Sequence, residues 1–317
     1  MVACTMTEAL HKHDSVLMTE VLEGLCIKAD GVYVDATFGR GGHSRAILTQ
    51  LGPKGRLIAI DKDPDAIDFA KQNFCNDKRF SIHHGSFANL LNILQAQQLD
   101  GKIDGIFLDL GVSSPQLDQA DRGFSFMREG LLDMRMDTTK GMSAADLIAN
   151  ISEAELADVL YEYGEERFSR RIAKAIIMAR TESPIETTQQ LAEIIKKAHP
   201  AWQKGKNPAT QSFQAIRIAV NNELDDLKAI LQQSYQALKI GGRLAVISFH
   251  SLEDRIVKQF MQKLEKPAAI TDKLPIKSGI HLPKFKKVSR AIKAKEIEVN
   301  QNPRARSAVL RIGEKLS

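Results

Sequence analysis

The amino-acid sequence predicts an α/β protein in which a mostly parallel sheet is interrupted by an all-helical insertion. Three observations support this fold class. Short β-rich runs alternate with helical stretches in the first third of the 317-residue chain, strand signals disappear from about 115 to 221, and one strand signal returns at 241–251. Because strands separated by helices pair in parallel, the flanking segments predict one sheet with helices on both faces.

The first third contains four strand signals separated by three helical stretches. The predicted strands cover 31–36, 55–63, 80–87 and 103–111, and the predicted helices cover 42–51, 64–74 and 88–99. Active sites of open α/β sheets form where the parallel strands end. The residues at the ends of these strands are therefore the first candidates for function.

The middle of the chain contains helical periods with recognisable start signals. Ser152 with Glu155, and Thr187 with Gln190, each match a capping box. Apolar residues recur at helical spacing between 168 and 179, and a long helical stretch from 213 to 240 precedes the last strand signal. The simplest organisation is one α/β domain, built from 1–114 and 222–317, with a helical domain at 115–221 inserted into it.

Composition and charge limit the class of protein. Hydrophobic residues make up 43% of the chain, which is enough for a sizeable core, and the formal net charge is +5. A mildly basic chain suits a polyanionic partner, but it also suits proteins that have none. The three cysteines have neither disulfide nor zinc-site spacing, and neither an apolar signal core nor a membrane-length apolar run is found. These features predict a cytoplasmic protein without a metal site.

A glycine-rich turn follows the first predicted strand. Gly39, Gly41 and Gly42 stand between that strand and a helix, so backbone can approach a ligand closely at the N-terminus of the helix. The dinucleotide fingerprint needs a third glycine where this chain has Ser44. An acidic residue within the strand, Asp35, is more typical of S-adenosylmethionine sites than of NAD sites. An ordinary tight turn is the alternative interpretation.

Two further carboxylates end predicted strands. Asp61 ends the second strand, where a carboxylate can accept both hydrogen bonds of a ribose diol in either cofactor. Asp109 ends the fourth, where it can accept N–H bonds of an exocyclic amine during in-line methyl transfer, or contact the cofactor. The amine of a nucleobase needs such help because its lone pair is delocalised into the ring. Asp109 could instead cap the following turn.

Six blocks in order resemble the MraW/RsmH family. They are "VDATFGRGGHS", "FLDLGVSSPQLDQADRGFSF", "LDMRMD", "ATQSFQAIRIAVNNEL", "ISFHSLEDRIVK" and "NPRARSA", and the resemblance runs from about His13 to Ile312. This family comprises bacterial S-adenosylmethionine-dependent enzymes that methylate N4 of a cytosine in 16S ribosomal RNA of the small subunit. The resemblance implies a class I methyltransferase Rossmann-like sheet, with a helical domain inserted after the fourth strand for RNA recognition.

The resemblance also implies a set of site residues. For cofactor binding these are Gly41, Gly42, His43, Asp61, Phe87, Asp109 and Gln116. The catalytic candidates, Asp109 and Asp133, come from the residues themselves: the first ends the fourth strand and the second lies in the charged segment after it. Phe87 could stack on the adenine or belong to the core, and His43 could bind the cofactor's carboxylate or merely begin the helix. The assignment of Gln116 depends on the family alone.

A charged segment follows the fourth strand. Arg122, Asp133, Arg135 and Asp137 lie among apolar residues, and the chain lacks the proline that the family usually has within 130–132. In the functional interpretation, the arginines hold phosphates and Asp133 orients the base. In the alternative, this is a solvated loop whose charges pair with one another.

Basic residues gather in the insertion and near the C-terminus. The insertion carries Arg167, Arg170, Arg171 and Lys174, then Lys196, Lys197, Lys204 and Lys206, and ten further cations lie from Lys273 to Arg306. RNA backbone contact explains these runs, although each could be a solvated face. The stretch after Pro267 is expected to be mobile until it binds a partner. Because aromatics make up only 6%, the sequence favours structured RNA over a single strand held by stacking.

Two other function classes stay open on the sequence. An NAD-dependent oxidoreductase would need the dinucleotide turn that Ser44 interrupts. A non-catalytic RNA-binding or assembly factor would keep the basic runs without needing Asp109 or the glycine turn. The sequence favours the methyltransferase acting on the small subunit, and it leaves the oligomeric state open.

Overall fold

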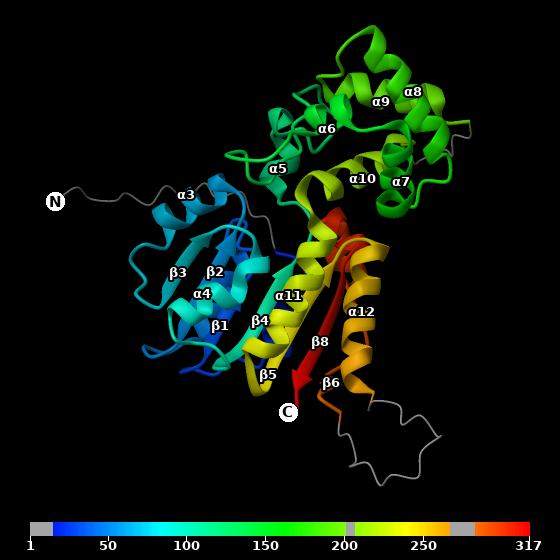
Figure 1. Ribbon diagram of the computed structural model, residues 1–317. Coiled ribbons are helices and arrows are strands. Elements are labelled where there is room, and N and C mark those ends of the chain that lie inside the picture. The colour runs from blue at the N-terminus through cyan, green and yellow to red at the C-terminus, as the bar shows by residue number, and fades with distance from the viewer. Residues whose placement is uncertain (1–14, 201–206, 267–282) are drawn as a thin grey trace, which may run out of the picture.

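A single eight-stranded sheet forms the centre of the protein. The structure is a computed structural model that describes residues 15–200, 207–266 and 283–317 (Figure 1). The strand order is β3-β2-β1-β4-β5-β8-β6, and β7 pairs with β8. The strands are β1 Val32–Asp35, β2 Arg56–Asp61, β3 Phe80–His84, β4 Ile103–Asp109, β5 Leu238–Ser248, β6 Phe285–Lys287, β7 Ile292–Lys293 and β8 Val309–Lys315.

The first five strands are parallel, as the sequence predicts. The chain runs outward from β1 through β2 to β3, then returns to place β4 on the other side of β1. This reversal is a topological switch point, where open α/β sheets bind ligands beyond the ends of the strands. In the register of the sheet, Asp35 of β1 pairs with Phe107 of β4, and Asp109 of β4 pairs with Ile247 of β5.

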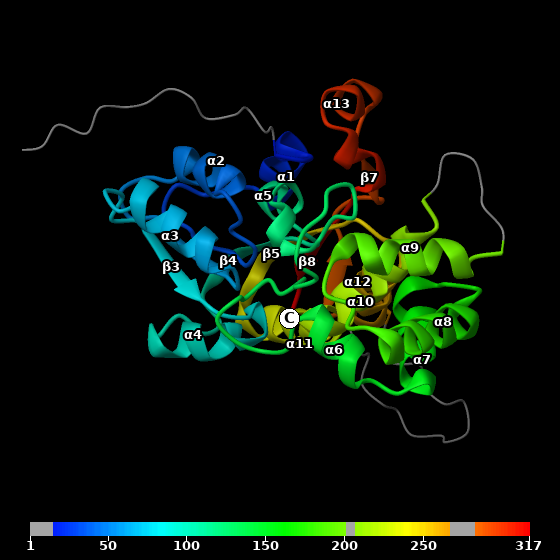
Figure 2. The same ribbon diagram turned by 90° about the horizontal axis from the view of Figure 1, so that it is seen from above.

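Helices cover both faces of the sheet, because the strands bury apolar side chains in alternation on each side. Tyr33 and Phe107 belong to one buried cluster, whereas Val34 and Leu108 belong to the other. Figure 2 shows α1, α2 and α3 on one side of the sheet and α4 and α11 on the other. The covering helices are α1 Met18–Leu25, α2 Gly42–Gln50, α3 Pro64–Asn73, α4 Leu90–Ala96, α11 Glu223–Ala237 and α12 Ser251–Glu265.

Between β4 and β5 the chain forms a group of helices with its own apolar core (Figure 1). They are α5 Ser114–Asp118, η2 Ala120–Arg122, α6 Ala144–Asn150, α7 Glu153–Gly164, α8 Ser169–Glu182, α9 Thr188–Ala198 and α10 Ala209–Asn221. Both expected capping boxes are present: the side chains of Ser152 and Thr187 accept from the backbone N–H three residues later. Figure 1 shows α5 to α10 beyond the carboxyl ends of β4 and β5.

Two expectations about the second half of the chain need correction. The single helical stretch expected from 213 to 240 is two helices, because Asn222 adopts a left-handed conformation with φ of 53° between α10 and α11. The mobility expected after Pro267 is wrong for 283–317. That segment adds β6, β7 and β8 to the sheet, with α13 Glu296–Gln301 and η3 Pro303–Ser307 between β7 and β8.

The reason for this second difference is burial. Phe285 and Leu310 are almost fully buried, and β8 pairs antiparallel with β5 along most of its length.

Four of the predicted RNA-contacting lysines, Lys204, Lys206, Lys273 and Lys277, lie outside the described residues. Across the described ranges, no helix is both long enough and apolar enough to cross a membrane.

Candidate active site

The glycine turn joins β1 to the N-terminus of α2. Gly39 and Gly41 have φ of 56° and 69°, which residues with a side chain rarely adopt. A Cβ on Gly41 would also lie 2.6 Å from the Phe38 ring, and a Cβ on Gly42 would collide with the Ser15 hydroxyl. The sequence predicted that glycine makes room for a ligand. The structure adds a second reason, because the protein's own side chains pack against this turn.

Asp35 and Ser44 hold the turn against the sheet. The Ser44 hydroxyl donates to Asp35 Oδ2 at 2.7 Å, and the backbone N–H of Thr37 donates to Asp35 Oδ1 at 3.2 Å. Ser44 thus uses its side chain where the dinucleotide fingerprint requires a glycine. Burial raises the pKa of Asp35 to about 6, despite these hydrogen bonds.

Asp61 connects the end of β2 to the same turn. Its Oδ2 accepts from the backbone N–H of Gly39 at 2.7 Å, and its Oδ1 accepts from that of Asp63 at 2.8 Å. Burial raises the pKa of Asp61 to about 6. Each carboxylate oxygen has a second lone pair, so these bonds leave acceptor capacity for a ribose diol.

Asp109 and His43 lie side by side at the switch point. Asp109 Oδ2 is 3.8 Å from His43 Nδ1, while Asp109 Oδ1 is buried without a hydrogen-bond partner among the described residues. Burial, followed by the charges of Asp35 and Glu253, raises the pKa of Asp109 to about 8. A buried oxygen left without a donor is costly, so this carboxyl group is expected to meet a ligand.

The tautomer of His43 follows from its contacts. Nε2 lies 3.0 Å from the carbonyl oxygen of Val16, and because a carbonyl only accepts, Nε2 carries the proton. Burial lowers the pKa of His43 to about 4, so the ring is neutral and Nδ1 is an acceptor. His43 therefore presents an acceptor to this space, and Asp109 presents only acceptors once its carboxyl group is ionised.

This chemistry fits a cationic ligand with N–H donors. Removal from water is the main cause that raises the pKa values of Asp35, Asp61 and Asp109, so a positive charge nearby would favour the ionised forms of all three. S-adenosylmethionine has a sulfonium and an ammonium group, and its carboxylate suits the N-terminus of α2. The residues present therefore fit this cofactor better than they fit a dinucleotide with its two phosphates.

Phe87 and Gln116 lie in short helices that follow β3 and β4. Phe87 begins the short helix η1 Phe87–Asn89, packs partly buried against the core, and has the Lys62 ammonium 6.0 Å from its ring centre. Gln116 is buried; its Oε1 accepts from the Ser113 backbone and its Nε2 donates to Asp63 Oδ2 at 2.8 Å. Gln116 thus gains a structural role that the sequence did not reveal, because it fixes the loop after β4 to the end of β2.

The charged segment after β4 pairs its charges internally. Asp133 accepts two hydrogen bonds from Arg135, at 2.9 and 2.7 Å, and although burial opposes the effect, Arg135 holds the pKa of Asp133 below its usual value. Arg122 pairs with Asp63 at 3.0 Å and also donates to the backbone carbonyl of Met136. For Arg122 this pairing matches the alternative interpretation, in which the charges pair within the protein. No described hydrogen bond or ion pair joins Asp133 to Asp109.

Sequence reasoning missed two residues that organise this site. Asp63 is buried and accepts from both Gln116 and Arg122. It is also the N-cap of α3, and an aspartate directly before a proline is the sequence signal that could have identified it. Asn221, at the end of α10, accepts from the Met136 backbone and donates to the Met134 carbonyl, both at 2.7 Å. No local pattern would have identified Asn221, because its partners are more than 80 residues away.

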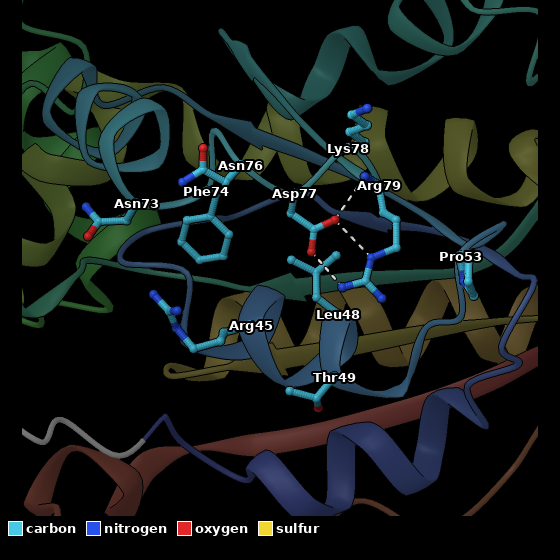
Figure 3. A pocket seen from close by; sticks show the side chains of 10 residues that line it. All are labelled: Arg45, Leu48, Thr49, Pro53, Asn73, Phe74, Asn76, Asp77, Lys78 and Arg79. Atoms are coloured by element: carbon cyan, nitrogen blue, oxygen red, sulfur yellow. Dashed lines mark hydrogen bonds and ion pairs between the residues drawn. The ribbon is translucent and has the colours of Figure 1, made fainter. Parts of the chain in front are cut away.

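The protein also has an open pocket of about 580 Å³ between α2 and the end of α3 (Figure 3). Arg45, Phe74 and the ion pair of Asp77 with Arg79 are among its lining residues. The lining contains none of the predicted cofactor residues. The candidate site is therefore defined by the strand ends and not by this pocket.

A doubly wound sheet with a glycine turn after β1 and carboxylates at three strand ends indicates an S-adenosylmethionine-dependent methyltransferase of class I. The model of the MraW methylase family matches residues 10–316, and the chain belongs to this family. A Legionella pneumophila (strain Paris) protein named "Ribosomal RNA small subunit methyltransferase H" is 58% identical over 306 residues, covering 96% of this chain and 99% of the relative.

A second relative and one solved structure extend the comparison. A Marinomonas protein of the same name is 55% identical over 313 residues, covering 98% of this chain and all of the relative. A SAM-dependent methyltransferase structure from Aquifex aeolicus, 10% identical, aligns over 95% of this chain and 90% of its own with a TM-score of 0.41.

Proposed function

We propose that the protein transfers the methyl group of S-adenosylmethionine to the exocyclic N4 of one cytosine in 16S ribosomal RNA of the small subunit. The unpartnered carboxyl oxygen of Asp109 at the switch point is the observation that carries this proposal. Membership of the MraW methylase family and the names of the relatives support the substrate. A ribosomal RNA substrate also places the reaction in the cytoplasm.

Asp109 is the residue on which the reaction depends. The cofactor supplies an electrophilic methyl group on a positively charged sulfur. Asp109 accepts an N–H bond of the cytosine amine, which localises the nitrogen lone pair and offsets the positive charge that develops as the new bond forms. The carboxyl is ionised for this task when positive charge lies beside it, because positive charge lowers its raised pKa.

The other site residues hold the two reactants. In this proposal Gly41, Gly42 and His43 bind the cofactor's amino-acid part at the start of α2. Asp61 binds the ribose, Phe87 contacts the adenine, and Gln116 fixes the loop after β4. Asp133, kept ionised by Arg135, orients the base from the segment that follows β4.

The helices at 115–221 are proposed to recognise RNA. Four exposed cations, Arg167, Arg170, Arg171 and Lys174, stand on or just before α8. By contrast, several C-terminal cations have acidic partners within the protein, for example Lys286 with Glu314. Because phosphate contacts need available positive charge, α8 is the stronger candidate for the RNA surface.

The decisive experiment is transfer of a labelled methyl group to small subunits from a strain that lacks the enzyme. We expect one cytosine to gain one methyl group on N4, as mapped by nuclease digestion and mass spectrometry. Label on another base or on protein would refute the substrate assignment. Calorimetry with S-adenosylmethionine and NAD tests the oxidoreductase alternative, which requires binding of NAD.

A further inference from the structure

A buried histidine lies one strand away from Asp109. His250 follows β5 and precedes α12, three residues after Ile247, which pairs with Asp109 in the sheet. The two strand ends stay adjacent, since the backbone N–H of Leu110 donates to the Ile247 carbonyl at 3.0 Å. The ends of β4 and β5 therefore bring His250 to the same edge of the sheet as Asp109.

The imidazole of His250 is held beside an acid at the first turn of α12. Nε2 is 3.1 Å from Glu253 Oε1, and the side chain is only 11% exposed. Neither ring nitrogen has a hydrogen-bond partner within the described segments. A carboxylate beside Nε2 favours the tautomer with the proton there, so Nδ1 becomes an acceptor without a donor.

Glu253 is fixed and ionised by its surroundings. Its Oε2 accepts from the backbone N–H groups of Phe249 and His250, at 2.8 and 3.3 Å. Burial raises its pKa, but His250 and then Arg217 outweigh burial and hold the pKa of Glu253 below its usual value. Arg217 is itself fixed by two hydrogen bonds of 2.8 Å to Glu223. This arrangement orients an imidazole as a base, in the way a carboxylate orients histidine in hydrolytic triads.

His250 is the N-cap residue of α12 and forms a capping box with Glu253, but neither ring nitrogen makes a well-formed hydrogen bond within the described segments. Glu253 supplies the other half of the box, since its carboxylate accepts from the backbone N–H groups of Phe249 and His250. Burying ring nitrogens without partners costs stability. Such a cost is expected at a functional position, where the missing partner is a substrate group.

Methylation of an amine also creates a proton that must leave. We propose that His250, oriented by Glu253, is a further catalytic residue that accepts this proton from N4. As the nitrogen lone pair bonds to the methyl carbon, the carbon–sulfur bond breaks and its electron pair stays on sulfur. The electrons of one N–H bond stay on nitrogen, and the proton passes to Nδ1 and then to water. This inference rests on the proposed function.

Single-turnover methyl transfer at saturating S-adenosylmethionine and RNA tests this role. We expect His250→Gln to lower the rate by about 100-fold or more, the range for loss of a general base, while the Kd of the cofactor stays unchanged. Glu253→Gln should have a smaller effect in the same direction. The matched control is His83→Gln, because His83 lies on β3 and contacts Gln97.

The pH profile separates this role from a structural one. A general base acts only in its unprotonated form, so the rate of the parent protein should fall as the pH is lowered, and His250→Gln should lose that dependence. The charged or titratable groups around His250 are Glu253 on α12, Glu165 after α7, Arg217 on α10 and Asp109 on β4. The same profile on Asp109→Asn identifies any limb that belongs to Asp109.

Three results would overturn the inference. These are a normal rate in His250→Gln, an acidic limb that persists in it, and a parent rate that is constant from pH 5.5 to 8. If a substitution at 250 prevents folding, the pH profiles of Glu253→Gln and Asp109→Asn decide the question. If the parent itself transfers no methyl group to RNA, the proposed function fails. If the parent transfers the methyl group and His250→Gln does so at the same rate, this inference alone is refuted.

Discussion

The strand ends and helix α8 carry opposite charges in different environments. At the strand ends, Asp35 is buried and Asp61 partly buried; both accept hydrogen bonds from neutral donors, and Asp109 has one oxygen without a donor among the described residues. On α8, Arg170 and Arg171 are exposed to solvent. Buried acids recognise a small cation at close range, whereas exposed cations attract a large polyanion through water. Cofactor binding and RNA binding should therefore respond to different substitutions.

The largest expected effect is at Asp109. Asp109→Asn keeps the shape but removes the charge, so single-turnover methyl transfer at saturating cofactor should slow by about 100-fold or more, as for loss of one preorganised electrostatic contact. The matched control is Asp104→Asn, because Asp104 lies near the amino end of the same strand, where it pairs with Lys239. A near-normal saturated rate with a raised cofactor Kd would move Asp109 to cofactor binding alone.

A smaller effect is expected at Asp61. Asp61→Ala removes a charged acceptor from the ribose position, so the cofactor should bind more weakly by about 1.5 to 3 kcal/mol, measured by calorimetry. Asp61 also accepts from the Gly39 backbone, so thermal unfolding of the free protein should be followed in parallel. Asp68→Ala is the control, because Asp68 is an exposed carboxylate of α3. Equal affinities for parent and variant would place Asp61 outside the site.

Removal of positive charge from α8 should weaken RNA binding and leave cofactor binding unchanged. Arg170→Ala combined with Arg171→Ala should weaken RNA binding and reduce the slope of log affinity against log salt by about one for each phosphate that is no longer neutralised. Cofactor affinity should not change. Lys54→Ala with Lys102→Ala removes the same charge at the amino ends of β2 and β4 and serves as the control. Identical salt slopes for all three proteins would show that α8 faces only solvent.

The smallest expected effect is the release of a proton when the cofactor binds. At pH 7 Asp109 is mostly protonated in the free protein, because burial raises its pKa to about 8. A bound cation lowers that pKa, so cofactor binding should release up to one proton, and affinity should rise with pH towards 8. Calorimetry in buffers of different ionisation enthalpy measures the release, which should decrease in Asp109→Asn. Release that is undiminished in this variant would assign the proton to another group.

Local pattern was enough for the elements that carry the site. Strands β1 to β4 were predicted because alternation of β-rich and helical runs is a property of neighbouring residues, and the two capping boxes were predicted for the same reason. The glycine turn was recognised because glycine lets backbone approach a ligand closely, and Gly39 and Gly41 do adopt left-handed angles. The roles of Asp109 and Asp133 remain predictions that the proposed experiments must test.

Contacts between distant segments were beyond the sequence. The pairing of β8 with β5, the bond from Gln116 to Asp63, and the position of His250 beside Glu253 near Asp109 all depend on how the strands are ordered. Charge patterning even misled, because the basic C-terminal segment was expected to be mobile and instead completes the sheet from 283 onward.

The sequence by itself determined the class of fold, the cofactor and the family, because periodicity, turn chemistry and motif order are written in neighbouring residues. Only the tertiary structure decided which charges are neutralised and which are left without partners. In sequence, Asp109 and Arg122 are both charged residues at or after the end of β4. In the structure, Arg122 pairs with Asp63, whereas one oxygen of Asp109 has no hydrogen-bond partner among the described residues. The physical reason is that burial and partner geometry set the energy of a charge, and both are created by folding.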